Sequence, residues 1–470
     1  MTDTRIEPRR YAAVTRRDLA RLPQLRALGE ERLLAMRALA AVLPFRVNTY
    51  VIDELIDWDN IPDDPLFQLT FPQEGMLDPE DFRRLVDLVR KEAPAAEIQA
   101  FARDVRLRMN PHPAGQRELN VPRLDGEPLP GLQHKYRETV LFFPGPGQTC
   151  HAYCTYCFRW AQFVGMEELK FASREAERLV RYVERHPEVS SVLITGGDPM
   201  VMKTRVLARY VEPLLRVESI RSIRIGTKAL AWWPYRFVTD DDADDLLRLF
   251  ERVRRAGKHL ALMAHVSHPR ELQPKPARVA IRRVQEAGAV IRCQAPVIRH
   301  VNDDPATWAE MWREQVHLGM VPYYMFVERD TGPKRYFELP LARVLEIFQE
   351  AYRQVSGLAR TVRGPSMSAT PGKVLVQGTA RIRGEKVFVL GFLQGRNPEW
   401  VGRPFFARYD ERATWLDELV PALGEPEFFF EPEMRRLELV AGLRPAPLRD
   451  AVPAHRAGRL PRLRPPGRPR

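Results

Sequence analysis

The central part of the chain alternates short apolar runs with longer amphipathic stretches. Six runs rich in Val, Ile, Leu and Phe are typical of strands buried in a parallel sheet; they are TVLFFP (139–144), SSVLITGGDP (190–199), IRSIRIGTK (220–228), HLALMAHV (259–266), AVIRCQAPVI (289–298) and VPYYMFVE (321–328). The intervals show helical periodicity, as in 172–186, 241–257 and 276–289. Repeated strand–helix units predict an α/β fold, best described as a partial or complete (β/α) barrel, with a doubly wound open sheet as the alternative.

Polar residues follow several of these runs directly. GGDP follows VLIT, GTK follows IRI, HVSH follows ALMA, and ERD follows YMFV. The carboxyl ends of parallel strands meet at one edge of the sheet, and α/β enzymes carry their chemistry at that edge. The pattern therefore predicts a functional site at the carboxyl edge.

The chain divides into four predicted regions. Residues 1–130 form an N-terminal helical and wrapping region, and 131–345 form the barrel. A small C-terminal extension (346–443) follows, with a helix at about 340–356 leading into it and short strands within 372–392. The last region (444–470) is rich in Arg and Pro and poor in large apolar residues, so it is predicted to be disordered.

Charge and composition narrow the class of protein. Hydrophobic residues make up 44% and charged residues 29% of the chain, as in ordinary globular proteins. No signal-like segment and no apolar run of membrane-spanning length is found, so we expect a cytoplasmic protein with reduced thiols and no membrane partner. The region 444–470 carries eight Arg and one Asp, which is +7 of the net charge of +12 and leaves +5 elsewhere. Nucleic-acid binding is therefore not expected.

Three of the four cysteines lie within eight residues, in GQTCHAYCTYCFRW (147–160). They are Cys150, Cys154 and Cys157, whereas Cys293 is far away and is expected to be structural. A disulfide is disfavoured in a reducing compartment, and zinc normally needs four Cys or His ligands. Three unrelated cysteines remain an alternative. The clustering favours an iron–sulfur cluster, in which three thiolates leave one iron free for another ligand.

The cysteine loop and several other segments of the chain resemble those of known protein families. A Cys-x3-Cys-x2-Cys loop after the first strand of a parallel barrel resembles the radical S-adenosylmethionine (SAM) superfamily, in which the free iron binds SAM. Over about residues 45–400 the chain resembles the lysine 2,3-aminomutase family within it. The matching segments occur in the family's order: DELIDWDNIPDDPL (53–66), GLQHKYRETVLFF (131–143), SVLITGGDPM (191–200), SIRIGTK (222–228), AHVSHP (264–269), CQAPVIRHVND (293–303) and VPYYMF (321–326).

The resemblance implies a [4Fe–4S] cluster on the three cysteines, SAM, and pyridoxal 5′-phosphate (PLP). Lys373, in GPSMSATPGKVLV (364–376), matches the PLP lysine, and Arg159 matches the arginine for the substrate α-carboxylate. Other matching positions are assigned to cofactors. They are Lys135 and Tyr136 near PLP, and Thr195, Gly196, Gly197, Asp198, His265 and Gln294 near SAM. The implied reaction moves an amino group from Cα to Cβ of an amino acid through a 5′-deoxyadenosyl radical.

The sequence departs from the lysine-specific members of the family. Arg329 and Arg363 stand where those members have two aspartates for the substrate's distal ammonium, with Asp330 one residue from the first of these sites. Arginine repels an ammonium and attracts a carboxylate, so we expect glutamate or aspartate as substrate. The C-terminal cysteines that bind zinc in some members are absent, so no zinc is expected.

The remaining expectations concern partners and alternatives. A small-molecule amino acid and an electron donor such as flavodoxin or ferredoxin are the expected partners, and a homo-oligomer is left open. One alternative is a lysine-directed aminomutase that supplies β-lysine for modification of a translation factor. Another is an iron–sulfur binding protein without enzymatic activity, whose Arg-rich tail contacts nucleic acid.

Overall fold

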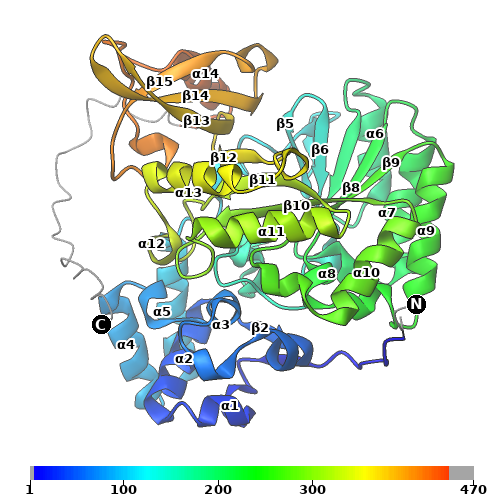
Figure 1. Cartoon of the computed structure of the whole chain (residues 1–470), viewed down its shortest axis with the longest axis vertical. Coiled ribbons are helices and arrows are strands. Elements are labelled where there is room, and N and C mark those ends of the chain that lie inside the picture. Colours follow the sequence, from blue (N-terminus) through cyan, green and yellow to red (C-terminus); the bar gives the residue numbers. More distant parts are fainter. Residues whose placement is uncertain (1–4, 444–470) are drawn as a thin grey trace.

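An 11-stranded mixed sheet forms the centre of the molecule, in a computed structural model that describes residues 5–443 (Figure 1). The tail predicted to be disordered (444–470) lies outside the described residues. All six predicted runs form parallel strands, joined by a seventh, β12; they are β6 (Thr139–Phe142), β7 (Ser191–Ile194), β8 (Ser222–Thr227), β9 (His259–His265), β10 (Val290–Val297), β11 (Val321–Val327) and β12 (Arg363–Ser368). The sheet keeps these strands in sequence order without a reversal, which is the topology of a partial (β/α) barrel and excludes the doubly wound alternative.

Helices cover the outer face of the parallel strands. They are α6 (Ala176–Glu184), α7 (Thr204–Val211), α9 (Ala243–Arg255), α10 (Lys275–Glu286), α11 (Pro305–His317) and α13 (Leu341–Arg353). Helix α9 lies within the helical interval predicted at 241–257, and its apolar residues Leu246, Leu249 and Val253 are fully buried. These side chains join Ile223 and Ile225 of β8 in one apolar core. Burial of these side chains removes a large apolar area from water and fixes the helices on the sheet.

Antiparallel strands extend the sheet at both ends. Strand β5 (Leu132–Tyr136) pairs with β6. At the other end, β13 (Gly372–Ile382), β14 (Glu385–Gly395) and β15 (Pro404–Arg408) continue from β12, followed by α14 (Glu431–Val440). The C-terminal strands therefore belong to the sheet of the barrel, and the β12–β13 turn places Lys373 at its interior.

The N-terminal region packs against the carboxyl end of the barrel (Figure 1). Its main helices are α1 (Pro23–Arg26), α2 (Glu30–Val42), α3 (Pro65–Thr70), α4 (Pro79–Arg90) and α5 (Ala95–Arg108), and its small sheets are β1 (Ala13–Thr15) with β2 (Arg46–Asn48) and β3 (Arg123–Leu124) with β4 (Glu127–Pro128). Phe67 and Phe71 share an apolar cluster with Tyr156 of the cysteine loop and with Trp232 and Ile298, which follow β8 and β10. The region thus covers the strand ends where the site is predicted.

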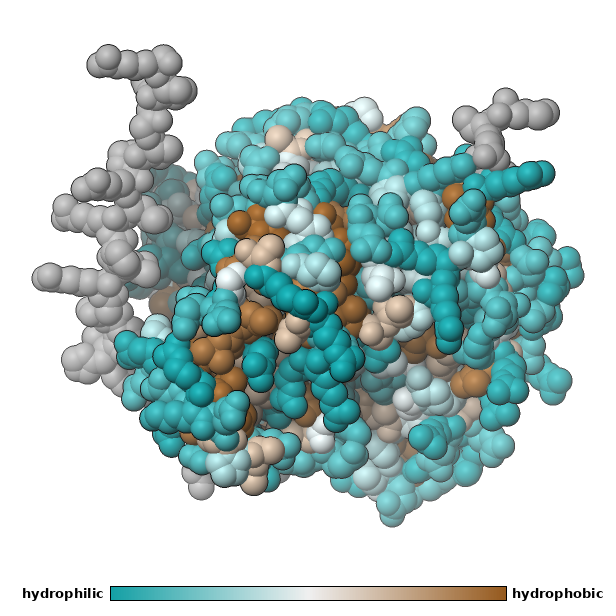
Figure 2. Space-filling view, turned by 90° about the horizontal axis from the view of Figure 1, so that it is seen from below, coloured by the Kyte–Doolittle hydropathy of each residue, from teal (hydrophilic) through white to brown (hydrophobic). Residues whose placement is uncertain are grey.

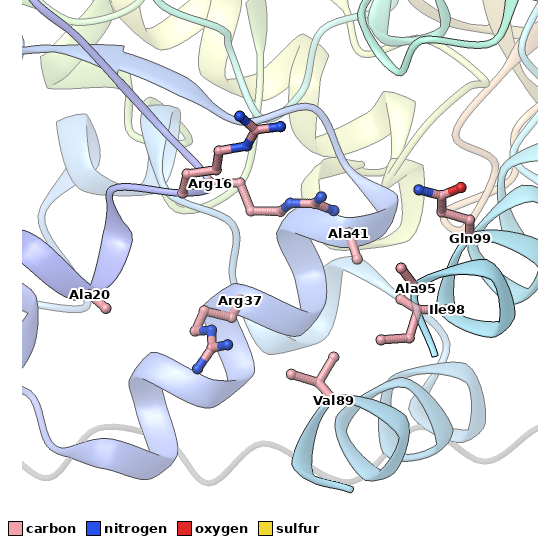
Figure 3. Close-up of a pocket in the computed structure, with 9 residues that line it drawn as sticks. Arg16, Ala20, Arg37, Ala41, Val89, Ala95, Ile98 and Gln99 are labelled. Carbon is pink, nitrogen blue, oxygen red and sulfur yellow. The ribbon is translucent and has the colours of Figure 1, made fainter. Parts of the chain in front are cut away.

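The outer surface of this part of the molecule is largely polar. In a view from below Figure 1, hydrophilic side chains cover most of the face, with smaller apolar areas between them (Figure 2). One hollow lies among α2, α4 and α5, where Arg16 and Arg37 face the apolar side chains Val89 and Ile98 (Figure 3). None of the predicted site residues lines it. No helix within residues 5–443 has the length and apolar character that crossing a bilayer requires.

Asn48 joins the N-terminal region to the barrel through buried hydrogen bonds. Its Nδ2 donates to the carbonyl oxygens of His151 (3.2 Å) and Trp232 (2.9 Å), and its Oδ1 accepts from the Val51 amide (3.1 Å). Asn48 is completely buried. One side chain therefore links β2, the cysteine loop and the segment after β8.

We predict that Asn48→Ala lowers the free energy of unfolding by about 1–3 kcal/mol, because it leaves buried carbonyl groups without a donor. Urea unfolding monitored by tryptophan fluorescence measures the change. The exposed Asn60→Ala is the matched control and is expected to change stability little. Equal stability of the two variants would contradict the assigned role of Asn48.

Candidate active site

The cysteine loop follows β6 and is held by backbone hydrogen bonds to the N-terminal region. The Tyr153 amide donates to the Arg46 carbonyl (2.8 Å) and the Thr155 amide to the Leu69 carbonyl (2.9 Å). Within the loop, the Cys157 amide donates to the Cys154 carbonyl (3.1 Å), so the segment turns back on itself. The three cysteine residues of the loop are half-buried, whereas Cys293 is buried in β10, as expected for a structural residue.

The donor set of this loop fits an iron–sulfur cluster better than a single metal ion. Among residues 5–443, no three His, Cys, Asp or Glu side chains are close enough to share one ion. A multi-iron cluster bonds each thiolate to a different iron, so its ligands are spaced more widely. Burial raises the pKa of Cys150, Cys154 and Cys157, so their thiolates need a cation such as iron to compensate the charge.

Gly196 and Gly197 allow the cysteine loop to lie directly on the end of β7. A Cβ atom at position 197 would overlap the backbone of Thr149, and one at position 196 would overlap the Gln148 side chain. Gly196 also has φ of +145°, which disfavours any other residue. The Asp198 amide donates to the Thr149 carbonyl (2.6 Å), which fastens the residue before Cys150.

Asp198 connects β7 to the neighbouring strand β8. Its carboxylate accepts hydrogen bonds from the Thr227 hydroxyl (2.8 Å) and from the amides of Lys228 (2.9 Å) and Met200 (2.9 Å). Burial is the largest influence on this carboxyl group and raises its pKa. These hydrogen bonds position the ends of β7 and β8, and the Asp198 carboxylate makes them with groups of the protein itself. Thr195 follows the end of β7 and lies directly before the two glycines.

His265 and Gln294 lie side by side, as register partners on β9 and β10. Burial lowers the pKa of His265 to about 3, with a smaller contribution from Lys228, so the imidazole is neutral. Lys228 forms a buried ion pair with Glu271 (2.7 Å), and Ser267 accepts from Lys228 (3.3 Å) and lies 3.1 Å from the Tyr156 hydroxyl. Sequence reasoning missed this network, although Lys228 stands in the GTK at the end of β8.

Two arginines, Arg159, which is buried, and Arg329, which is half-buried, lie at the cysteine loop. Arg159 lies over the Phe143 ring at 4.0 Å, and Arg329 over the Phe158 ring at 5.0 Å. The Nε and Nη2 atoms of both side chains are buried and lack hydrogen-bond partners among the described residues. Burial, partly offset by Cys157 and reinforced by Arg329, lowers the pKa of Arg159 to about 10. Unpartnered guanidinium nitrogens in a buried site are suited to an anionic ligand.

Lys373 lies on β13 with its ammonium over the rings of Tyr324 (3.9 Å) and Phe326 (5.4 Å). Burial, together with the charges of Arg224 and Arg363, lowers the pKa of Lys373 to about 7. A substantial fraction of the amine is therefore neutral near physiological pH, which a nucleophilic lysine requires. The adjacent Gly372 is needed because a Cβ there would overlap the Gln394 carbonyl.

Lys135 and Tyr136 lie near the turn that carries Lys373. The Lys135 ammonium donates to the Ala369 carbonyl in the β12–β13 turn. Burial, then Arg396, Arg329 and Lys373, lowers its pKa. Burial raises the pKa of Tyr136 to about 12, so its hydroxyl remains protonated. Arg396, which sequence reasoning missed, donates to the Thr370 carbonyl (2.8 Å) in the same turn.

The structure does not bring Arg329 and Arg363 together. Arg363 pairs in register with Tyr324, whereas Arg329 lies five residues beyond Tyr324, past the end of β11. At about 3.3 Å per residue, the part of β11 from Tyr324 to its end at Val327 alone spans ~10 Å, so the two arginines lie at different levels of the barrel. Arg363 instead lies over the rings of Tyr323 and Tyr324, at 4.3 and 4.6 Å. The Asp330 carboxylate accepts a hydrogen bond from the Asn110 side chain (3.3 Å). Burial lowers the pKa of Arg329, and the negative charge of Asp330 partly offsets this effect.

The fold and the site define a class of enzyme. A partial (β/α) barrel whose first parallel strand leads into a Cys-x3-Cys-x2-Cys loop is a radical SAM barrel. No family model matches the sequence. A protein of Aquifex aeolicus with the provisional name L-lysine 2,3-aminomutase is 30% identical over 399 residues, which are 85% of this chain and 93% of that protein. The chain belongs to the lysine 2,3-aminomutase family.

Two further proteins show lower sequence identity to this chain. The L-lysine 2,3-aminomutase of Bacillus subtilis is 23% identical over 68% of this chain and 71% of its own length. Among solved structures, a radical SAM methyltransferase from Sphaerobacter thermophilus covers 49% of this chain and 68% of its own, with 19% identity and a TM-score of 0.35. That TM-score is too low to establish a shared fold, so the fold rests on the strand order.

We predict that Gly197→Ala displaces the cysteine loop and lowers the free energy of unfolding by about 1–3 kcal/mol, because the new methyl group overlaps the Thr149 backbone. Urea unfolding and the iron content after reconstitution measure the two effects. Gly378→Ala is the control, since a Cβ there meets no atom within 4 Å. Unchanged iron content and stability in Gly197→Ala would show that the close contact is unimportant.

We predict that reductive methylation of Lys373 rises with pH and reaches half its maximum near pH 7. Below this pH the ammonium is protonated and unreactive, and above it the neutral amine attacks the aldehyde. Peptide mass spectrometry gives the rate at this lysine. Arg363→Gln removes a neighbouring positive charge and is expected to move the midpoint to higher pH. Arg360→Gln is the control, and an equal shift in it would refute the electrostatic explanation.

Proposed function

We propose that the protein is a radical SAM, PLP-dependent 2,3-aminomutase, an isomerase that acts on an acidic α-amino acid, glutamate or aspartate. Membership of the lysine 2,3-aminomutase family supports the reaction type. The substrate assignment rests on Arg159 and Arg329, whose guanidinium groups have buried, unpartnered nitrogens beside the cysteine loop. Flavodoxin or ferredoxin is the kind of electron donor that such an enzyme needs.

The residues present fit the three cofactors of the family. Cys150, Cys154 and Cys157 would hold a [4Fe–4S] cluster, which supplies the electron that cleaves SAM to a 5′-deoxyadenosyl radical. The glycines after β7, with His265 and Gln294, would line the SAM site. Lys373 would hold PLP, which supplies an electron sink for the migrating nitrogen, and Lys135 and Tyr136 would lie near that cofactor.

The arginines determine which substrate charge is accepted. Arg159 would bind the α-carboxylate, because a planar guanidinium can bind a carboxylate through two parallel hydrogen bonds. Arg329 would bind the side-chain carboxylate. A lysine ammonium would be repelled by Arg329 at this depth, since charges interact strongly in a medium of low dielectric constant. Arg363 lies in a separate group, so we assign the side-chain carboxylate to Arg329 alone.

The surrounding residues would orient the substrate and exclude water. The neutral fraction of Lys373 provides a nucleophilic amine at physiological pH. The N-terminal region covers the strand ends through the cluster that includes Phe67 and Tyr156. Shielding from water protects a reactive radical from side reactions, and rigid positioning of the substrate favours transfer of the Cβ hydrogen.

A second candidate is a lysine-directed aminomutase. The related proteins are named for L-lysine. Asp330 supports this candidate, because its Oδ1 is buried and lacks a partner among the described residues. Such an oxygen suits an ammonium group. We nevertheless favour the acidic substrate, because Arg329 stands between Glu328 and Asp330 in the sequence and adds a positive charge there. Burial raises the pKa of Glu328, so this second carboxyl group adds little negative charge.

The test is an anaerobic assay with reconstituted protein, SAM, PLP and a reductant, and with glutamate, aspartate, lysine and alanine supplied separately. Mass spectrometry detects β-amino products. We expect a product from glutamate or aspartate, none from lysine, and none in Lys373→Ala. Arg329→Gln is expected to lower kcat/KM by ~10- to 100-fold, the effect of a lost hydrogen bond between charged groups. Arg360→Gln is the control.

Each other outcome contradicts part of the proposal. A product from lysine alone would support the second candidate and refute the role of Arg329. Unchanged kcat/KM in Arg329→Gln with an acidic substrate would refute that role as well. Cleavage of SAM without any β-amino acid would refute the aminomutase assignment.

A further inference from the structure

A basic cavity of about 400 Å³ lies at the amino end of the barrel strands. The first residues of four consecutive parallel strands, from β6 to β9, line one side of it; they are Thr139, Ser191, Ser222 and His259. The other lining residues come from β8 to β12 and from β14; they are Arg224, Ala261, Arg292, Tyr323, Arg363 and Gln394. The assignments made above for SAM and for the substrate use neither Arg224 nor Arg292.

Three arginines line this cavity, and no carboxylate side chain lines it with them. None of the ten lining residues is acidic, and among the residues that the structure describes none of the three arginines forms an ion pair. Arg292 and Arg363 both lie over the Tyr323 ring, at 5.0 and 4.3 Å, so their charges are close together. The Nε of Arg224 is buried and has no hydrogen-bond partner within residues 5–443. All three arginines are half-buried, so water screens only part of the repulsion between them, and a bound anion would offset the remainder.

The position of the cavity makes a purely structural role a poor explanation. In (β/α) barrels the amino end of the strands serves stability and is expected to be filled by well-packed, satisfied side chains. Stability would be better served by apolar residues than by unpaired arginines. The lining also offers hydroxyl groups next to the arginines, since Arg224 Nη2 lies 3.4 Å from the Thr139 hydroxyl and Ser222 donates to Ser191 (2.8 Å).

We propose that this cavity binds a phosphate group between Arg224, Arg292 and Arg363. A phosphomonoester carries about −1.5 to −2 charges and has three strong acceptor oxygens, which match three guanidinium groups and neighbouring hydroxyls better than a single carboxylate does. Two sources share this chemistry, a phosphorylated small molecule from solution and the phosphate of PLP. Lys135, which the family resemblance puts near PLP, contacts the Ala369 carbonyl and does not line the cavity, which favours the first source.

Occupancy of the cavity would also affect Lys373. The charges of Arg224 and Arg363 contribute to the lowered pKa of Lys373, so an anion between these arginines would raise it. The phosphate site stands independently of the proposed reaction. Its test measures binding without SAM, substrate or turnover, so failure of one proposal leaves the other intact.

The experiment measures binding of inorganic phosphate to the full-length protein by calorimetry, in the absence and presence of saturating PLP, at constant ionic strength set with chloride. We expect Arg292→Gln to weaken phosphate binding by ~10-fold or more, because a charge-assisted hydrogen bond is lost. Arg360→Gln is the matched control, since Arg360 lies over Tyr352 at 5.5 Å outside the cavity. Thermal unfolding without phosphate checks the fold, and Arg292→Gln is expected to be at least as stable as the parent.

The calorimetric measurements with and without PLP identify the source of the phosphate group. If phosphate still binds in the presence of PLP, the cavity takes a phosphorylated molecule from solution. If PLP abolishes phosphate binding and Arg292→Gln weakens PLP binding, the cavity takes the phosphate of the cofactor. The proposal is overturned if phosphate does not bind to the PLP-free protein, or if Arg292→Gln binds phosphate and PLP as tightly as the Arg360→Gln control.

Discussion

The close contact between the cysteine loop and the end of β7 is the constraint on which the site depends. The backbone of Thr149 lies against Gly197 so closely that no side chain fits between them, and Asp198 then holds Thr149 through its amide. The same aspartate binds Thr227 and Lys228 at the end of β8. The turn at residues 196–198 therefore sets the distance between the cysteine loop and the strands β7 and β8. The positions of the three thiols depend on this turn.

Excess positive charge inside the barrel is the second organising feature. Arg159 and Arg329 lie near the cysteine loop, and the Lys373 ammonium lies over Tyr324 of β11. Arg224 and Arg363 line the cavity at the amino end of the strands. Burying unpaired cations is unfavourable, so their presence indicates ligands that bring negative charge. The same charges lower the pKa of Lys373 and so adjust the reactivity of the amine. In the sites proposed here, anion binding and the reactivity of this amine would be coupled through electrostatics.

The N-terminal region completes the site from outside the barrel. Backbone groups of Arg46 and Leu69 accept hydrogen bonds from the cysteine loop, and the aromatic side chains of Phe67 and Phe71 pack in the same cluster as Tyr156. A loop with few regular hydrogen bonds of its own gains rigidity from these contacts. The N-terminal region therefore helps to position the thiols and to exclude water from the loop.

The sequence by itself determined the parallel strands and the cysteine loop, because local periodicity and close spacing along the chain encode them. It also pointed to Lys373 and Arg159 through the resemblance to a family. Strand β12 was missed because its Gly and Pro suggest a loop, and the two arginines expected to act together lie at different levels of the barrel. The Lys228–Glu271 pair, the basic cavity and the pKa of Lys373 depend on side chains from different strands. Only the tertiary structure brings such residues together, since burial and Coulomb interactions act through space and not along the sequence.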